Sequence, residues 1–115
     1  MTLRAWTFAL THYESGDLVA IAVVCPEDQY VTAMWVSGRT DRYQATSGQW
    51  QAIGRELDDG VGKTPLPAGS VLLSLLASNA SLGIQVRCLN VRDVTIARPS
   101  DAARALDTVL REQAP

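Results

Sequence analysis

The chain has 115 residues, of which 47% are hydrophobic and 19% are charged, and its net charge at pH 7 is −2. These proportions are typical of one globular domain spanning residues 1–115, and they exclude a disordered chain. The slight excess of acidic residues argues against general binding of nucleic acids, whose phosphates are held mainly by Lys and Arg. We therefore expect no nucleic-acid partner.

The first residues, MTLRAWTF, lack the apolar stretch and the cleavage site of a secretory signal peptide. No apolar run reaches the roughly 18 positions that a membrane-spanning helix needs. We therefore expect a cytoplasmic protein with no membrane partner. In that compartment Cys25 and Cys88 should be reduced thiols within strands, and because their spacing matches no metal motif we expect neither a metal nor a cofactor.

Alternating apolar and polar residues predict three strands at the start of the chain. Positions 3–13 have period two, positions 18–25 form a nearly continuous apolar run, and positions 29–36 give a third strand. Polar turns at 14–17 and 26–28 connect them, so an antiparallel meander is predicted. One face of this meander should be small enough for a helix to approach closely. The alanines assigned to that face are Ala5, Ala9, Ala20, Ala22 and Ala33.

Two helices are predicted in the middle of the chain. A polar loop is expected at 37–48, and Ser47 is a candidate cap for a helix over about 48–58. The apolar run at 70–80 favours a short buried helix, with a fourth strand as the alternative, because short apolar runs do not distinguish the two by periodicity.

The last third of the chain predicts more sheet and a C-terminal helix. Positions 83–98 contain either a hairpin that turns at NVRD or one long strand with a bulge, and the hairpin is favoured. The apolar residues expected on one common side are Ile84, Val86, Cys88, Val94 and Ile96. A helix then runs from Pro99 to about Glu112. The predicted fold class is α+β: an antiparallel sheet of four or five strands packed against two or three helices, including the C-terminal helix.

The stretch DDGVGKT at 58–64 contains the Gly-Lys-Thr that ends a phosphate-binding loop, but three features oppose that interpretation. The first glycine of the motif would stand at position 57, which is Leu57. The stretch follows a predicted helix rather than a strand, and Pro65 comes directly after it. Its two aspartates would repel a phosphate. We predict a helix stop and a solvated turn, with no nucleotide site.

Four residues are candidates for binding a small ligand. Arg39, Arg42 and Tyr43 lie in the predicted loop after the third strand, where they could hold a carboxylate or a phosphate. His12, the only histidine, lies at a strand end. The alternatives are that the arginines and the tyrosine lie in an ordinary solvated loop, and that His12 is a partly exposed residue at a strand end with no catalytic or binding role.

No spacing of Ser, Cys, His and carboxylates indicates a catalytic triad, so no catalytic residue is assigned. Glu14 or Asp17, across the first turn, could orient His12. A pocket near His12, Trp35, Arg39 and Arg42 would define a ligand-binding domain or a small enzyme.

Positions 64–86 contain no charged residue, and VLLSLLA at 71–77 has no polar face. This helix either packs between the sheet and the C-terminal helix or contacts another protein, which makes Leu72, Leu75 and Leu76 candidate interface residues. A homodimer is predicted, because this segment and an unpaired sheet edge both need covering.

Acidic residues occupy both turns of the predicted meander. Glu14 and Asp17 stand at one end, and Glu27 and Asp28 stand at the other. Complementary charge speeds association, which favours a basic partner protein; the alternative is that these acids keep the sheet soluble. Our leading interpretation is a non-enzymatic interaction protein, such as an inhibitor, an immunity-type protein or an adaptor. The alternative is the ligand-binding domain or small enzyme.

Overall fold

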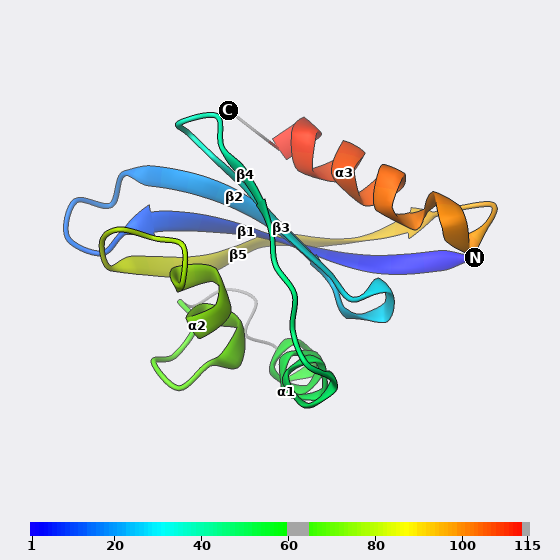
Figure 1. Ribbon diagram of the computed structural model, residues 1–115, viewed down its shortest axis with the longest axis horizontal. Helices are drawn as coiled ribbons and strands as arrows, with labels where there is room; N and C mark the ends of the chain where they lie inside the picture. Colours follow the sequence, from blue (N-terminus) through cyan, green and yellow to red (C-terminus); the bar gives the residue numbers. More distant parts are fainter. Residues whose placement is uncertain (60–64, 114–115) are drawn as a thin grey trace.

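The computed structural model describes residues 1–59 and 65–113. They form an α+β fold, with one five-stranded antiparallel sheet and helices on both of its faces (Figure 1). The predicted fold class is therefore confirmed. The C-terminal helix packs on the sheet, as predicted.

The first four strands form a meander in chain order. They are β1 (Thr2–His12), β2 (Leu18–Cys25), β3 (Tyr30–Trp35) and β4 (Thr40–Arg42). The turn after β1 contains Gly16 with a φ of 78°, a left-handed conformation that glycine adopts without strain. The 3-10 turn η1 (Pro26–Asp28) connects β2 to β3. The three predicted strands are confirmed.

The fourth strand corrects the prediction of a loop at 37–48. Thr40 pairs with Met34, and Arg42 pairs with Thr32, so β4 extends the sheet beyond β3. A strand of three residues is too short to show an alternating pattern, which is why the sequence did not indicate it.

The last strand is β5 (Ile84–Thr95), a single strand of 12 residues, so the favoured hairpin is wrong and the alternative, one long strand with a bulge, is confirmed. It pairs antiparallel with β1 along nearly its whole length, which gives the sheet the order β4-β3-β2-β1-β5. Leu89 is the extra residue of a β-bulge, because Cys88 and Asn90 pair with adjacent residues of β1. The bulge lets the strand continue where a hairpin turn was expected.

The bulge also overturns the predicted common side of this segment. Val86 and Cys88, before the bulge, pack on one face of the sheet. Val94 and Ile96, after it, pack on the opposite face. One extra residue reverses the side to which every later residue points.

Helix α1 (Ser47–Asp58) confirms the first predicted helix, but its cap is Thr46 and not Ser47. The Gln49 backbone N–H donates to the Thr46 hydroxyl (3.2 Å), and the Thr46 N–H donates to the Gln49 side chain (2.8 Å), which forms a capping box. As predicted, a helix precedes the stretch at 58–64. Positions 60–64, which hold most of this predicted turn, lie outside the described residues.

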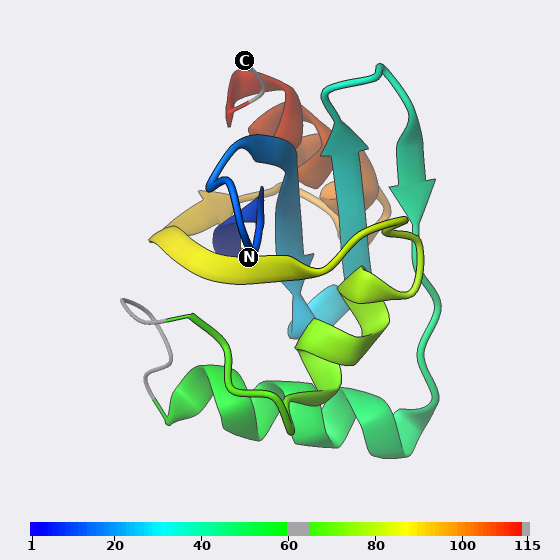
Figure 2. The same cartoon turned by 90° about the vertical axis from the view of Figure 1, so that its left-hand side faces the viewer.

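Helix α2 (Val71–Ala77) confirms the second predicted helix. Ser70 caps it, and Glu56 of α1 adds a second cap: the Glu56 carboxylate accepts hydrogen bonds from the Ser70 hydroxyl (2.5 Å) and the Val71 N–H (2.8 Å). Helices α1 and α2 lie together on one face of the sheet (Figure 2). The expectation that this helix packs between the sheet and the C-terminal helix is wrong.

Helix α3 (Ala102–Gln113) follows the 3-10 turn η3 (Pro99–Asp101) and covers the other face alone (Figure 1). The Tyr30 hydroxyl donates a hydrogen bond of 2.6 Å to Asp107 of α3. Arg42 Nη2 donates to the same carboxylate oxygen at 2.9 Å. These contacts connect the helix to β3 and β4.

The predicted small face is wrong because the register divides the alanines between both faces. Phe8 pairs with Ala22, and Ala9 pairs with Ile21, so each face combines large and small side chains. On the face of α1 and α2 the sheet's alanines are Ala20, Ala22 and Ala33, and on the face of α3 they are Ala5 and Ala9.

Cys25 and Cys88 are free, buried thiols in β2 and β5, which confirms their predicted place in strands. Burial raises the pKa of each thiol and so lowers its reactivity.

Candidate functional site

Three loops meet where β1 ends, opposite the N-terminus along that strand (Figure 1). We call this surface, made of residues 12–17, 36–39 and 78–83, the loop end. The Tyr13 N–H donates to the Gly83 carbonyl (3.0 Å), and Arg39 Nη2 donates to the Asn79 carbonyl (2.9 Å). These bonds hold the loop after α2 against the other two.

Two adjoining hollows open at the loop end, with volumes of about 220 and 410 Å³. His12 and Leu82 line both of them. Trp35 and Arg39 belong to the smaller hollow, and Glu14 belongs to the larger one. The structure therefore brings His12, Trp35 and Arg39 together at one opening.

Exposed apolar side chains surround these hollows. Tyr13 is 68% exposed, Val36 is 59% exposed and Leu82 is 64% exposed, and each lines at least one hollow. Sequence reasoning missed all three, because a single apolar residue in a turn makes no periodic pattern. The available signal was an apolar residue set among turn residues, such as Leu82 between Ser81 and Gly83.

Arg39 is held by its neighbours within the protein. Its Nε lies 2.8 Å from Asp41 Oδ2, and its guanidinium carbon lies 4.7 Å from the centre of the Trp35 ring. The Trp35 indole N–H donates to the same Asp41 oxygen at 2.7 Å. With the bond to Asn79, these contacts fix the positive charge of Arg39 at the rim of the smaller hollow.

His12 stands at the end of β1, and its contacts with the following turn are made by its backbone. The His12 N–H donates to the Asp17 carbonyl (2.9 Å), and the Gly16 N–H donates to the His12 carbonyl (3.0 Å). Glu14 and Asp17, which could orient the imidazole, are exposed on the same turn. His12 lines both hollows.

Arg42 and Tyr43, the other two ligand candidates, lie away from His12. Arg42 contacts Asp107, and its guanidinium carbon lies 4.8 Å from the centre of the Tyr30 ring, so it belongs to the contact between the sheet and α3. Tyr43 is buried under α2, with its hydroxyl 3.4 Å from the Leu76 carbonyl, and burial raises its pKa. Successive side chains of β4 point to opposite faces of the sheet, so Arg42 points away from Asp41. Because Arg39 is paired with Asp41, Arg42 is also separated from Arg39.

The candidate interface residues fall into separate parts of the molecule. Leu72 and Leu76 are fully buried between α1 and the sheet, and Leu75 is half-buried. Glu27 and Asp28 are exposed in η1, at the end of the sheet opposite the loop end.

Within residues 1–59 and 65–113, no helix has the length and apolar character needed to cross a bilayer. The described part of the chain also holds no group of three His, Cys, Asp or Glu side chains arranged to bind a metal ion. Comparison of the chain with protein-family models, with curated proteins and with solved structures found no match.

Proposed function

We propose that this chain is a small, non-enzymatic cytoplasmic protein that binds a partner protein through the loop end. The observation that carries the proposal is the gathering of Tyr13, Val36 and Leu82 around two adjoining hollows. These are three of the six large hydrophobic side chains exposed among the described residues. Apolar side chains gathered over a hollow are typical of protein interfaces, whereas single exposed ones are common everywhere.

The charges at the rim select the kind of partner. Glu14 and Asp17 are exposed beside the apolar side chains, and the positive charge of Arg39 is already paired with Asp41. The surface therefore favours a partner that presents an apolar segment flanked by basic residues. An inhibitor, an immunity-type protein or an adaptor would act in this way, by occupying a surface of its partner.

A small-ligand site at the loop end is the second candidate function. The smaller hollow, of about 220 Å³, combines an imidazole, an indole and a fixed guanidinium from His12, Trp35 and Arg39. Such a set could hold a small anion or an aromatic carboxylate. A metabolite that raises the melting temperature of the wild-type protein, but not of His12→Ala, would favour this function.

Site-specific photo-crosslinking tests the proposal in the organism that carries the gene. A benzophenone amino acid at position 13 should give one discrete adduct, identified by mass spectrometry, because Tyr13 is 68% exposed and lines the larger hollow. The same probe at Gln51, which is exposed on α1, is the matched control and should give none. An adduct of twice the chain mass would identify the partner as a second copy, the predicted homodimer.

Leu82→Asp provides the second arm of the test. It should remove the adduct at position 13 and leave the free energy of unfolding unchanged, because Leu82 is an exposed loop residue. Equal adducts from positions 13 and 51, or an adduct that survives Leu82→Asp, would contradict binding at the loop end.

A further inference from the structure

The outer edge of β5 is a second surface, separate from the loop end. β5 is the edge strand of the sheet, and β1 is its neighbour on the inner side. Among the described residues, the Leu66 N–H donates to the Val86 carbonyl at this outer edge (2.8 Å). Leu89, the bulge residue, is 50% exposed, and Val91 beyond it is 46% exposed. An edge strand with exposed apolar residues is a template for pairing with another strand.

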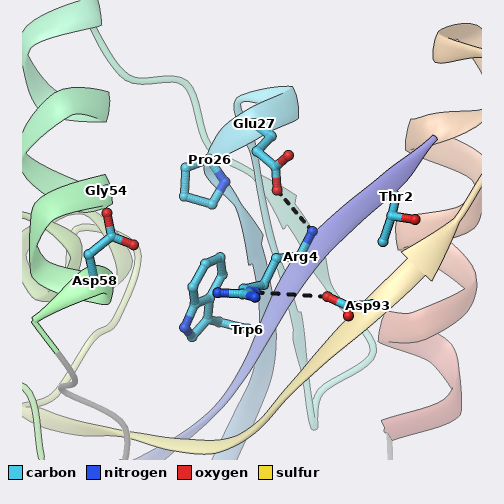
Figure 3. Close-up of a pocket in the computed structure, with 8 residues that line it drawn as sticks. All are labelled: Thr2, Arg4, Trp6, Pro26, Glu27, Gly54, Asp58 and Asp93. Carbon is cyan, nitrogen blue, oxygen red and sulfur yellow. Dashed lines mark hydrogen bonds and ion pairs between the residues drawn. The ribbon is translucent and has the colours of Figure 1, made fainter.

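A groove of about 510 Å³ lies beside this edge, on the face of the sheet that α1 covers (Figure 3). Arg4 and Trp6 of β1 lie at its floor, and Asp93 of β5 joins them there. Asp58 of α1 stands on the opposite wall, and Glu27 of η1 closes one end. Asp93 therefore belongs to both the edge strand and the groove.

The groove has three carboxylates and one guanidinium among its lining residues. Arg4 Nε lies 3.8 Å from Asp93 Oδ1, and the Arg4 backbone N–H donates to Glu27 Oε1 at 2.9 Å. Acidic charge remains in excess, beside the half-exposed ring of Trp6. An indole face and carboxylates together suit a guanidinium or an ammonium on an aliphatic chain.

We propose that the outer edge of β5 and this groove together bind an extended segment of a partner protein that carries a basic residue. The register supplies the spacing. Val91 and Asp93 pair with Trp6 and Arg4, so both point to the side of the groove. Side chains of an added strand alternate, so those on that side lie two residues apart. One packs on Val91, and the next enters the groove at Asp93. The bound segment therefore has an apolar residue two positions from Arg or Lys.

A pentapeptide tests this arrangement without assuming the direction of the added strand. The probe is acetyl-Val-Thr-Arg-Thr-Val-amide, in which an apolar residue stands two positions from Arg on both sides. Titrated into the full-length protein labelled with ¹⁵N, it should shift the backbone amides of residues 89–95 and the Trp6 indole N–H in a saturable way. Replacing Arg by citrulline keeps the shape and removes the charge, and it should weaken binding by about tenfold.

Two further probes separate strand addition from binding of a cation alone. N-methylation of every backbone amide of the peptide removes the donors on both of its edges, and it should abolish the shifts along β5 whichever direction the added strand takes. Acetyl-arginine-amide should shift the Trp6 indole only weakly. Full binding by either probe would overturn the proposal, since the segment would then not pair with the edge.

Protein variants give the same test from the other side. Asp58→Asn should weaken the pentapeptide by roughly two- to fivefold, as expected for a partly exposed ion pair. Asp101→Asn is the matched control, because Asp101 lies in η3 on the side of the sheet that α3 covers. This substitution should leave the affinity for the pentapeptide unchanged. Binding insensitive to citrulline and to Asp58→Asn would overturn the proposal. So would β5 amide shifts that grow with protein concentration alone, since they would assign the edge to a second copy.

Discussion

Helices α1 and α2 cover one face of the sheet as a linked pair, whereas α3 covers the other face alone. On the first face, Glu56 of α1 caps α2 through the Ser70 hydroxyl and the Val71 N–H, so one helix holds the other. On the second face, Asp107 accepts hydrogen bonds from Tyr30 and Arg42, so the helix is held by the sheet. On each face, these directional polar contacts fix the position of a helix that apolar packing alone would hold less specifically.

The difference follows from the lengths of the helices. α2 has seven residues and would not be stable alone in water, so it depends on its cap and on burial. α3 has 12 residues with an apolar stripe, and its polar contacts set how it lies on the sheet. The cap that Glu56 provides for α2 also affects the loop end, because the chain leaves α2 at Ser78 and reaches Leu82 four residues later.

The largest expected effect is in the core beneath α2. Leu76→Ala should lower the free energy of unfolding by ~2–5 kcal/mol, because Leu76 is fully buried and truncation leaves a cavity. Urea denaturation measures the loss, and Leu75→Ala is the matched control with a smaller expected effect, since Leu75 is half-buried. Equal losses for the two variants would show that the outer side of α2 is also covered.

Glu56→Ala should destabilise the protein by about 1–3 kcal/mol, because it removes an ionised cap from the buried start of α2. Hydrogen exchange should show faster opening of residues 71–77 than of α3. Gln51→Ala, on the exposed side of α1, controls for the loss of a polar side chain. If exchange in α2 and α3 accelerates equally, the two faces are not held independently.

Tyr30→Phe should cost roughly 1–2 kcal/mol at pH 8, because it removes a hydrogen bond to the Asp107 carboxylate. Burial, and next the hydrogen bond to Asp107, raise the pKa of Tyr30 from 10 to about 12. The folded protein therefore keeps the phenol proton over a range in which the unfolded chain loses it. This stabilisation is complete below pH 10 and is lost as pH rises towards 12.

Urea denaturation of the wild type and of Tyr30→Phe at pH 8 and at pH 11 measures this effect. The difference between the two proteins should be smaller at the higher pH, and groups common to both cancel in it. A difference that stays constant would mean that Tyr30 ionises in the folded protein as it does in the unfolded chain.

Local patterns in the sequence were sufficient for the fold class and for most elements. Periodicity located the first three strands, and apolar stripes or runs located the three helices to within about two residues at most ends. The pairing between segments that are distant in the sequence could not be predicted from such local patterns. The position of the bulge at Leu89 depends on the register with β1, which lies some 80 positions earlier. No residue type near Leu89 indicates this position.

The candidate site shows the same limit. Arg39 and Arg42 are three positions apart in the sequence, yet β4 directs them to different surroundings, and the two contact Asp41 and Asp107 respectively. Tyr13, Val36 and Leu82 come from three different loops, so only the folded chain brings them together. A pattern within one segment indicates its own structure, whereas a surface built from several loops depends on tertiary contacts.

The smallest expected effect distinguishes two ion pairs of similar geometry on α3. Arg92 Nη2 lies 2.9 Å from Glu112 Oε2, and Arg42 Nη2 lies 2.9 Å from Asp107 Oδ1, with both pairs partly exposed. A double-mutant cycle on Arg92 and Glu112 should give a coupling energy of about 0.2–1 kcal/mol that falls with added salt. The coupling of Arg42 with Asp107 should be larger and less sensitive to salt, because Asp107 also accepts from the buried Tyr30. Equal couplings would show that the sheet holds α3 evenly along its length, and the contrast between the two faces would then rest on Glu56 alone.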